Sequence, residues 1–316
     1  MVGRTDRKTV LVTGAGGYVG SALVVRLAER GWRVVGFGHG GSYPALARRL
    51  PESVTLVSGD LTDADAVCEV TRGVDAVVHS GSVTGEASCR RDLPGAVRTI
   101  VRGTRMVVDA VRENGVGRLV HLSTYAVYST FRERPMPLAE DMELTPDDVY
   151  GALKAEAEWE ASRVPSAILR LTNVYGVGSG IVLKRDVIGR FITAAREGAP
   201  LTMYGEGTQG IDFVHIDDVC RVVAELIDLP LGEGPLVLNV GSGKVTSIRQ
   251  VAETAAALAR EVLGQDVSIV SQEAPPGKIW PDRWVATERL RKAFPWFPGQ
   301  SLEQGMREIM HQQWDA

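Results

Sequence analysis

A tyrosine and a lysine four residues apart, Tyr150 and Lys154, form the pair in this chain best suited to proton transfer. On a helix, residues at this spacing share one face, so the lysine ammonium can approach the phenol oxygen. A free phenol has a pKa of about 10, and lowering it to about 7 takes roughly 4 kcal/mol of preferential anion stabilisation. Nearby positive charge supplies such stabilisation. The pair therefore predicts a general acid or base, against the alternative of a surface helix with a solvated lysine.

Three glycines near the start of the chain, Gly14, Gly17 and Gly20, form a GxxGxxG turn. An apolar run, Val10–Val12, precedes the turn and an apolar-periodic stretch, Val19–Leu27, follows it, which predicts a strand, a tight turn and a helix. Glycine allows close approach of a pyrophosphate, and the start of the helix offers N–H groups and a positive dipole end to that anion. The turn alone fits an ordinary glycine-rich loop as well. The proton-transfer pair about 130 residues later favours a dinucleotide site.

Further segments follow in a fixed order along nearly the whole chain. They are Gly59–Leu61, Val77–His79, His121–Tyr128, Arg170–Gly176, Tyr204–Gln209, Asp212–Val219 and Leu238–Gly243. With the two motifs, these segments resemble the extended short-chain dehydrogenase/reductases, in particular the NAD-dependent epimerase/dehydratase family that acts on nucleotide sugars, of the UDP-glucose 4-epimerase-like kind.

The resemblance implies roles for individual residues. Tyr150 and Lys154 would act with the hydroxyl of Thr124, or of Ser123 as the fallback. The substrate would contact Asn173, Thr124 and Tyr150, and no metal is expected. The dinucleotide would be held by the glycine turn and by residues after the following strands, namely Gly14, Gly17, Tyr18, Val19, Gly20, Gly38, His39, Asp60, Leu61, Ser80 and Lys154.

The apolar runs predict an α/β fold with a Rossmann-type, doubly wound parallel sheet and a smaller C-terminal substrate-binding lobe. We expect the dinucleotide-binding domain to span 1–174 plus about 212–241, and the substrate-binding lobe to span 175–211 and 242–316. The longest helix is expected from about Ala96 to Glu113. The predicted strands are Val10–Thr13, Arg33–Phe37, Val54–Ser58, Ala76–His79, Arg118–Leu122 and Ser166–Leu171.

Composition restricts the partners and the location. A net charge of -4 argues against nucleic acid as a partner, because phosphate contacts usually need a basic surface. The three cysteines, Cys68, Cys89 and Cys220, are odd in number and form no CxxC, which favours reduced thiols in a cytoplasmic protein. No signal peptide opens the chain and no apolar run reaches membrane-spanning length, so no membrane partner is expected.

The end of the second strand departs from the family pattern. Relatives place there an Asp that binds the adenosine ribose of NAD, whereas this chain has Gly38 followed by His39. No carboxylate occurs from Gly31 to Pro51, and the stretch offers polar groups that suit a ribose phosphate. We therefore slightly favour NADP over NAD, the alternative being that backbone groups hold the NAD ribose. The polar groups are Arg33, His39, Ser42, Arg48 and Arg49.

The expected diphosphate contacts also depart from the family pattern. Ile211 and Pro276 stand where relatives usually carry Arg, and isoleucine cannot replace a bidentate guanidinium. Asn173 is retained, so a nucleotide sugar remains the expected substrate. Basic residues that could compensate are Lys184, Arg185, Arg190, Lys278 and Arg283.

Tyr125 and Ala126 follow the expected triad hydroxyl, where dehydratases carry an Asp and a Glu. A 4,6-dehydration is therefore not expected. We predict an NAD(P)-dependent nucleotide-sugar epimerase, which removes and returns a hydride through a transient keto-sugar. The alternatives are an NAD(P)H-dependent ketoreductase of a nucleotide-linked keto-deoxysugar and, less favoured, a non-catalytic dinucleotide-sensing protein.

Two helices, near 96–113 and 148–162, resemble the pair that forms a dimer interface in relatives. We predict a homodimer through these helices. The alternative is that both helices only cover the sheet.

Overall fold

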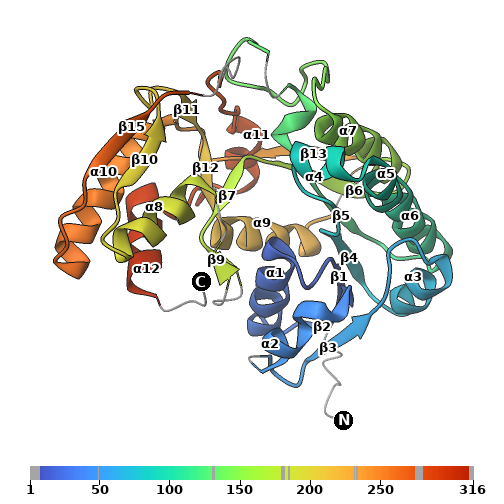
Figure 1. Ribbon diagram of the computed structural model, residues 1–316. Coiled ribbons are helices and arrows are strands. Elements are labelled where there is room, and N and C mark those ends of the chain that lie inside the picture. Colours follow the sequence, from blue (N-terminus) through green and yellow to red (C-terminus); the bar gives the residue numbers. More distant parts are fainter. Residues whose placement is uncertain are drawn as a thin grey trace. The chain divides into compact units, whose positions relative to one another are not determined.

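Seven strands form one sheet in the order β13-β6-β5-β4-β1-β2-β3. The computed structural model describes residues 8–48, 50–129, 132–178, 182–183, 186–230, 232, 234–274 and 280–312 (Figure 1). β1 pairs in parallel with both β2 and β4. The sheet therefore grows from β1 to one side through β2 and β3 and to the other side through β4 and β5, as in doubly wound sheets. The strands are β1 (Thr9–Thr13), β2 (Arg33–Gly38), β3 (Val54–Ser58), β4 (Ala76–His79), β5 (Leu119–Thr124), β6 (Ser166–Leu171) and β13 (Leu236–Val240).

Continuous apolar runs build the central strands because helices cover both faces of the sheet. Leu11, Val77 and Leu119 have no exposed surface. The six strands predicted from the sequence are confirmed, with ends that differ by at most two residues. The predicted α/β class with a Rossmann-type sheet is also confirmed.

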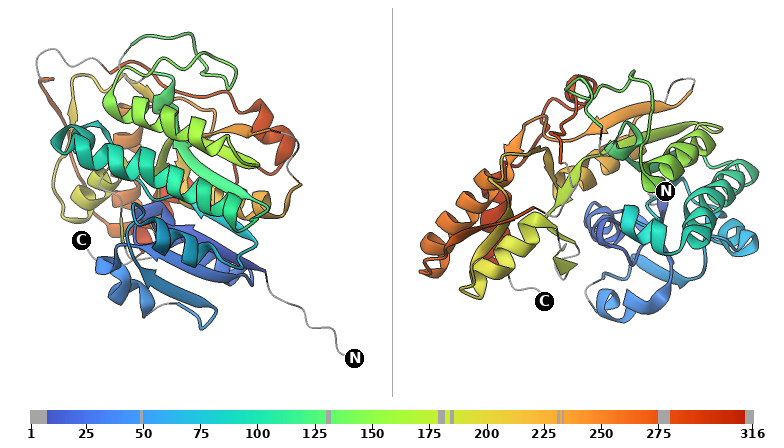
Figure 2. Two further views of the ribbon diagram at one scale, coloured as in Figure 1. Left: turned by 90° about the vertical axis from the view of Figure 1, so that its right-hand side faces the viewer. Right: turned by 45° about the horizontal axis from the view of Figure 1, so that its top comes forward.

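The helices of the sheet region lie in two groups, with α3, α6 and α7 on one side and α1 on the other (Figure 1). The stretch predicted as one long helix, Ala96 to Glu113, is helical throughout, but a π-helical turn, Arg98–Arg102, lies between the end of α5 at Val97 and the start of α6. α6 and α7 lie side by side (Figure 2). The helices are α1 (Tyr18–Glu29), α2 (Tyr43–Ala47), α3 (Ala64–Thr71), α4 (Glu86–Arg91), α5 (Leu93–Val97), α6 (Gly103–Glu113) and α7 (Val149–Ala161).

The chain divides into two compact units, each assembled from separate segments. The first comprises 1–130, 144–170 and 220–238, and the second comprises 131–143, 171–219 and 239–316. The boundaries differ from those expected, chiefly because the segment before residue 144 groups with the second unit. Both α9 (Ile216–Asp228) and β13 contain a boundary.

The second unit has a core formed by helices and short strand pairs. Phe191, Leu201, Val251 and Met306 are buried in it. The strand pairs are β7 (Asn173–Tyr175) with β12 (Phe213–His215), β8 (Val177–Gly178) with β9 (Val182–Leu183), β10 (Leu201–Tyr204) with β15 (Ile269–Gln272), and β11 (Gly210–Ile211) with β14 (Thr246–Ser247). The helices are α8 (Val187–Arg196), α10 (Ile248–Leu258), α11 (Glu288–Ala293) and α12 (Leu302–His311). None of the helices in the described ranges has the length and apolar character needed to span a bilayer.

Candidate active site

The start of α7 positions the proton-transfer pair. The Asp148 side chain caps the helix by accepting a hydrogen bond from Gly151 N at 2.7 Å. A Cβ at Gly151 would collide with the carbonyl oxygen of Ala126, so glycine lets the first turn of α7 approach the end of β5 closely. Tyr150 lies in this first turn, and its hydroxyl forms a hydrogen bond with the Thr124 side chain.

Lys154 lies one turn further along α7 and is buried. Its Nζ donates to the Leu122 carbonyl oxygen at 2.7 Å and lies 3.5 Å from His121 Nε2. Burial lowers the pKa of Lys154 to about 8, while the negative charge of Glu158 acts in the opposite direction. The ammonium is therefore anchored to the backbone of β5.

The phenol of Tyr150 is less acidic than a free phenol in this structure. Burial is the largest cause that raises its pKa, and the buried Cys89 adds to the increase. The hydrogen bond with Thr124 lowers the pKa by a smaller amount. The net direction is opposite to the lowering expected from the sequence, because desolvation outweighs the stabilising contacts.

The two candidate hydroxyls on β5 have different partners. Ser123 Oγ donates to Glu158 Oε1 at 2.5 Å and is committed to that carboxylate. Thr124 Oγ1 accepts from Ala126 N at 3.2 Å, and the Thr124 hydroxyl is also hydrogen-bonded to the hydroxyl of Tyr150. The arrangement favours Thr124, the first choice from the sequence, over Ser123.

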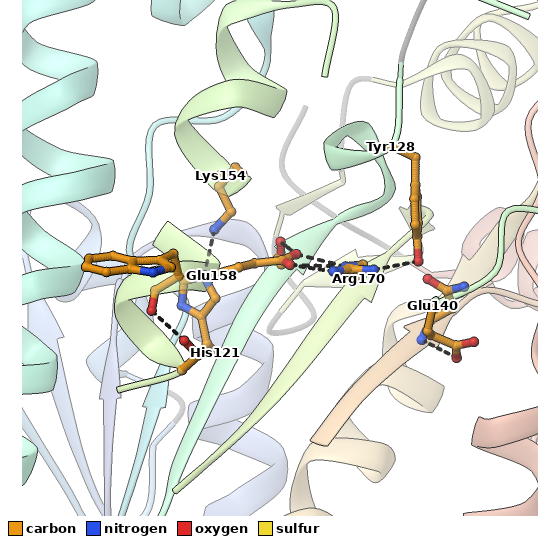
Figure 3. Close-up of polar contacts among 10 residues, drawn as sticks. His121, Tyr128, Glu140, Lys154, Glu158 and Arg170 are labelled. Carbon is orange, nitrogen blue, oxygen red and sulfur yellow. Dashed lines mark hydrogen bonds and ion pairs between the residues drawn. The ribbon is translucent and has the colours of Figure 1, made fainter. Parts of the chain in front are cut away.

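A buried ion pair behind these hydroxyls was not foreseen from the sequence. Arg170 Nη2 donates to Glu158 Oε2 at 2.7 Å, and Arg170 Nη1 donates to the hydroxyl of Tyr128 at 2.8 Å (Figure 3). The guanidinium also lies 4.8 Å from the centre of the Tyr128 ring. The available signal was an arginine inside the apolar run Ser166–Leu171, since a buried arginine needs a partner.

Two buried histidines lie on neighbouring strands beside Lys154. His79 Nδ1 is 2.7 Å from Thr13 Oγ1, and its Nε2 is 3.0 Å from Thr104 Oγ1. Burial, with a smaller contribution from Lys154, lowers the pKa of His79 to about 3 and lowers that of His121 well below its usual value. Both rings are therefore neutral at pH 7.

The glycine turn has the shape that a pyrophosphate site requires. Gly14 adopts a φ of +68°, and a Cβ there would lie 2.6 Å from Gly81 Cα. A Cβ at Gly20 would collide with the Gly14 carbonyl oxygen. α1 begins after Gly17 without a side-chain cap or an acidic residue in its first turn, so its N-terminus suits an anion. Tyr18 and Val19 are half-buried in that turn, and the Ser80 hydroxyl donates to Thr13 O at 2.6 Å.

The ends of β2 and β3 meet beside the glycine turn. A Cβ at Gly38 would lie 3.6 Å from Gly14 Cα, and the φ of +155° at Gly38 is one that other residues rarely adopt. Asp60 accepts two hydrogen bonds from Thr62, and its pKa is lowered mainly by these, with further contributions from the charges of His39 and Arg98. Leu61 is buried. These positions fit the adenosine end of a dinucleotide.

Asn173 lies in the second unit, on β7. Its Nδ2 donates to the Asp212 carbonyl oxygen at 3.2 Å. Ile211 pairs in a β-bridge with Arg283, which is buried, whereas Arg190 is exposed on α8. Lys184, Arg185, Pro276 and Lys278 lie outside the described residues. The part of the chain that the structure describes contains no group of three or more His, Cys, Asp or Glu side chains placed to bind a metal.

Comparison with known proteins decides the family. The NAD dependent epimerase/dehydratase family matches residues 10–241. The chain belongs to this family. A UDP-glucose 4-epimerase of Azospirillum brasilense is 30% identical, over 92% of this chain and 87% of that protein. A 2-alkyl-3-oxoalkanoate reductase of Stenotrophomonas maltophilia (strain K279a) is 28% identical, over 95% of this chain and 98% of that protein.

A solved structure gives the same picture. MoeE5 in complex with UDP-glucose and NAD is 27% identical, with a TM-score of 0.79 over 96% of this chain and 97% of that chain. The family resemblance drawn from the motifs is thus confirmed. The NAD bound in this relative supports NAD binding by the family to which this chain belongs.

Proposed function

We propose that this protein is an NAD-dependent nucleotide-sugar epimerase that works through a transient keto-sugar. The observation that carries the proposal is the grouping of Thr124, Tyr150 and Lys154 at the junction of β5 and α7. The relatives that act on or bind UDP-glucose support the substrate class. The retained Asn173 fits the same class.

Each residue of the group has a distinct task. Thr124 would donate a hydrogen bond to the reacting sugar oxygen, and Tyr150 would take the proton from that oxygen and later return it. Lys154, fixed by the Leu122 carbonyl, would hold positive charge near the phenol and position the nicotinamide ribose. The nicotinamide supplies the hydride chemistry. Because burial, with smaller contributions from nearby groups such as Cys89, raises the pKa of Tyr150, the phenol needs that positive charge to act as a base.

The residues after Thr124 argue against dehydration. Ala126 is buried, and Tyr125 is half-buried at the start of a 3₁₀ turn. Neither side chain offers a carboxyl group for the acid and base steps of water elimination. The chemistry at this site is therefore limited to hydride and proton exchange at one carbon.

NAD is the dinucleotide we propose, and the NADP preference drawn from Gly38 stays a prediction. The solved relative holds NAD. Gly38 removes the carboxylate that repels a ribose phosphate, while Asp60 places a negative charge close to His39. NADP would therefore be tolerated better than in relatives that carry an Asp at this position.

A ketoreductase is the second candidate. The relative from Stenotrophomonas maltophilia is a reductase and matches nearly the whole chain. Reduction of a ketone needs the same hydroxyl, tyrosine and lysine as epimerisation. The two reactions differ in whether the dinucleotide stays bound between turnovers. A non-catalytic sensor remains the third alternative, and no described feature favours it.

Arg283 is our candidate for the missing diphosphate contact. It lies directly across the β-bridge from Ile211, where relatives carry an arginine. The guanidinium is buried, and Nη1 donates to the Asp282 carbonyl oxygen at 2.8 Å. A guanidinium at this place would suit bidentate hydrogen bonding to a diphosphate. The functional division into a dinucleotide-binding and a substrate-binding part, as expected from the sequence, likewise stays a proposal.

A homodimer through α6 and α7 is also proposed. Trp159 on α7 is 61% exposed, an unusual position for a large apolar side chain on a monomer surface. Asp109 on α6 and Arg163, just after α7, are 3.4 Å apart, which joins the two helices. Free cysteines among the described residues fit the cytoplasmic location that we propose.

The first experiment is to denature the purified protein and identify any released dinucleotide by mass spectrometry, together with assays on UDP-glucose and other sugar nucleotides. Stoichiometric NAD with interconversion of two epimers supports the epimerase. A dinucleotide-free protein that oxidises NADPH with keto-substrates supports the ketoreductase. Turnover that survives both Tyr150→Phe and Lys154→Ala would refute the proposed site.

A further inference from the structure

The carboxylate of Glu158 lies inside the first unit, one helical turn after Lys154 and two turns after Tyr150. Only 5% of the residue is exposed. Oε1 accepts from Ser123 Oγ at 2.5 Å and from Arg170 Nε at 3.0 Å, and Oε2 accepts from Arg170 Nη2 at 2.7 Å (Figure 3). The carboxylate is thus buried and hydrogen-bonded to side chains from two strands.

These contacts join the elements that carry the reaction. Ser123 is the neighbour of Thr124 at the end of β5, and Arg170 lies on β6. Arg170 continues to the hydroxyl of Tyr128, the residue that follows the 3₁₀ turn after β5. The Glu158 carboxylate therefore fixes α7 against both ends of the segment that presents the catalytic hydroxyl.

The negative charge of the same carboxylate also acts on Lys154. The titratable groups that interact with Lys154 are the neutral His79 and His121 from the sheet and Glu158 from its own helix. Burial lowers the pKa of Lys154, and Glu158 is the group that raises it. Without that negative charge, the lowering of the Lys154 pKa by burial would not be opposed by Glu158.

We propose that Glu158 is a positioning residue: it holds the end of β5 that carries Thr124 against α7, and it places a negative charge one helical turn from Lys154, on the same face of α7. The effect of Glu158 on catalysis rests on the proposed function. Its contacts and its effect on Lys154 do not depend on any substrate. Glu160 provides a matched control, because it is equally buried on the same helix and instead pairs with Arg163 at 2.5 Å.

The first test measures Lys154 directly. The chain has only six lysines, so protein labelled with ¹³C at lysine Cε gives a simple NMR spectrum, and Lys154→Arg assigns the resonance. We expect the Lys154 titration midpoint to fall by about half a pH unit or more in Glu158→Gln, and to stay unchanged in Glu160→Gln. An unchanged midpoint in Glu158→Gln would overturn the proposal. If that variant does not fold, Glu158→Gln/Arg170→Met removes both buried charges, and the midpoint should still fall.

The second test measures turnover against pH. In Glu158→Gln the alkaline limb of the kcat/KM profile, which reports the enzyme without substrate, should move to lower pH by the same amount as the NMR midpoint, and Glu158→Asp should recover part of the shift. A lower kcat with an unmoved alkaline limb would mean a purely structural role and would also overturn the proposal. If no sugar nucleotide is turned over, the proposed function fails, while the NMR midpoint still decides the role of Glu158.

Discussion

Glu158 in the first unit and Asp212 in the second are both almost completely buried, but their oxygens meet different partners. Glu158 receives side chains, Ser123 and Arg170, from other elements. Asp212 receives Ser242 N and Oγ, each at 2.7 Å, and Gly243 N at 3.1 Å. Asp212 forms no ion pair within the described residues, and burial raises its pKa to about 6.

The difference shows two uses of a buried charge. The Asp212 carboxylate organises the backbone turn at Ser242 and Gly243 through N–H and O–H donors, so it needs no matching cation. The Glu158 carboxylate links strands to a helix through an arginine, so its removal affects the relative position and charge of the catalytic groups. The following predictions test this contrast, beginning with the largest expected effect.

Tyr150→Phe should lower kcat by about 10³-fold, because it removes the group that exchanges the proton with the sugar oxygen. The free energy of unfolding should change little. Steady-state assays of epimer interconversion measure the loss, and a folded Asp212→Asn variant, expected to keep most of its kcat, is the control. Equal losses of kcat in the two variants would contradict the prediction that Tyr150 acts in the reaction and that the Asp212 carboxylate does not.

Arg170→Met should lower the free energy of unfolding by about 3–5 kcal/mol, because it leaves the Glu158 carboxylate buried without its counter-charge. Glu158→Gln/Arg170→Met should recover most of that loss, since neither charge then remains. Urea unfolding at pH 7 measures both. Arg163→Met, which removes an exposed arginine just after α7, should cost less than Arg170→Met. A double variant as unstable as the single one would show that the pair does not act as a unit.

Asp212→Asn tests the other carboxylate through pH. The folded protein binds a proton at Asp212 more readily than the unfolded chain does between pH 3.8 and about 6. Stability from this group is therefore present at low pH and is lost as the pH rises through about 6. The difference in unfolding free energy between the natural protein and the variant should shrink by roughly 3 kcal/mol from pH 4 to pH 7. A difference that does not vary with pH would contradict the raised pKa.

Ser123→Ala should have the smallest effect, a fall in kcat of about fivefold, because Ser123 acts only by holding the end of β5. Thr124→Ala removes the hydrogen bond to the reacting oxygen and should cost about 10²-fold. Side-by-side kcat measurements at one pH compare them. The reverse order would make Ser123 the catalytic hydroxyl and would require its bond to Glu158 to break during the reaction.

The sequence was sufficient for features encoded locally. The strands at Val54–Ser58 and Ala76–His79 are apolar or β-branched up to a single polar residue at the end, and Tyr150 and Lys154 are related by helical spacing alone. The π-helical turn at Arg98–Arg102 was missed because one extra residue in a helix leaves the apolar pattern almost unchanged.

Features that depend on distant contacts could not be predicted. The pairing of Glu158 with Arg170 joins α7 to β6, and its geometry follows only from how those elements pack. The direction of the Tyr150 pKa shift depends on the burial of the phenol, which no spacing reveals. The positive φ at Gly38 is a further feature of this kind. An Asp at this position, as in relatives, would require a change of the backbone angle as well as of the side chain.

The placement of β13 has a consequence for how the protein is made. This strand, Leu236–Val240, is the edge neighbour of β6, yet more than sixty residues of the chain separate them. During synthesis on the ribosome, the sheet cannot be completed until residue 240 has left the exit tunnel. The segment 171–219, which belongs to the second unit, has then already emerged, so the two units cannot fold strictly one after the other.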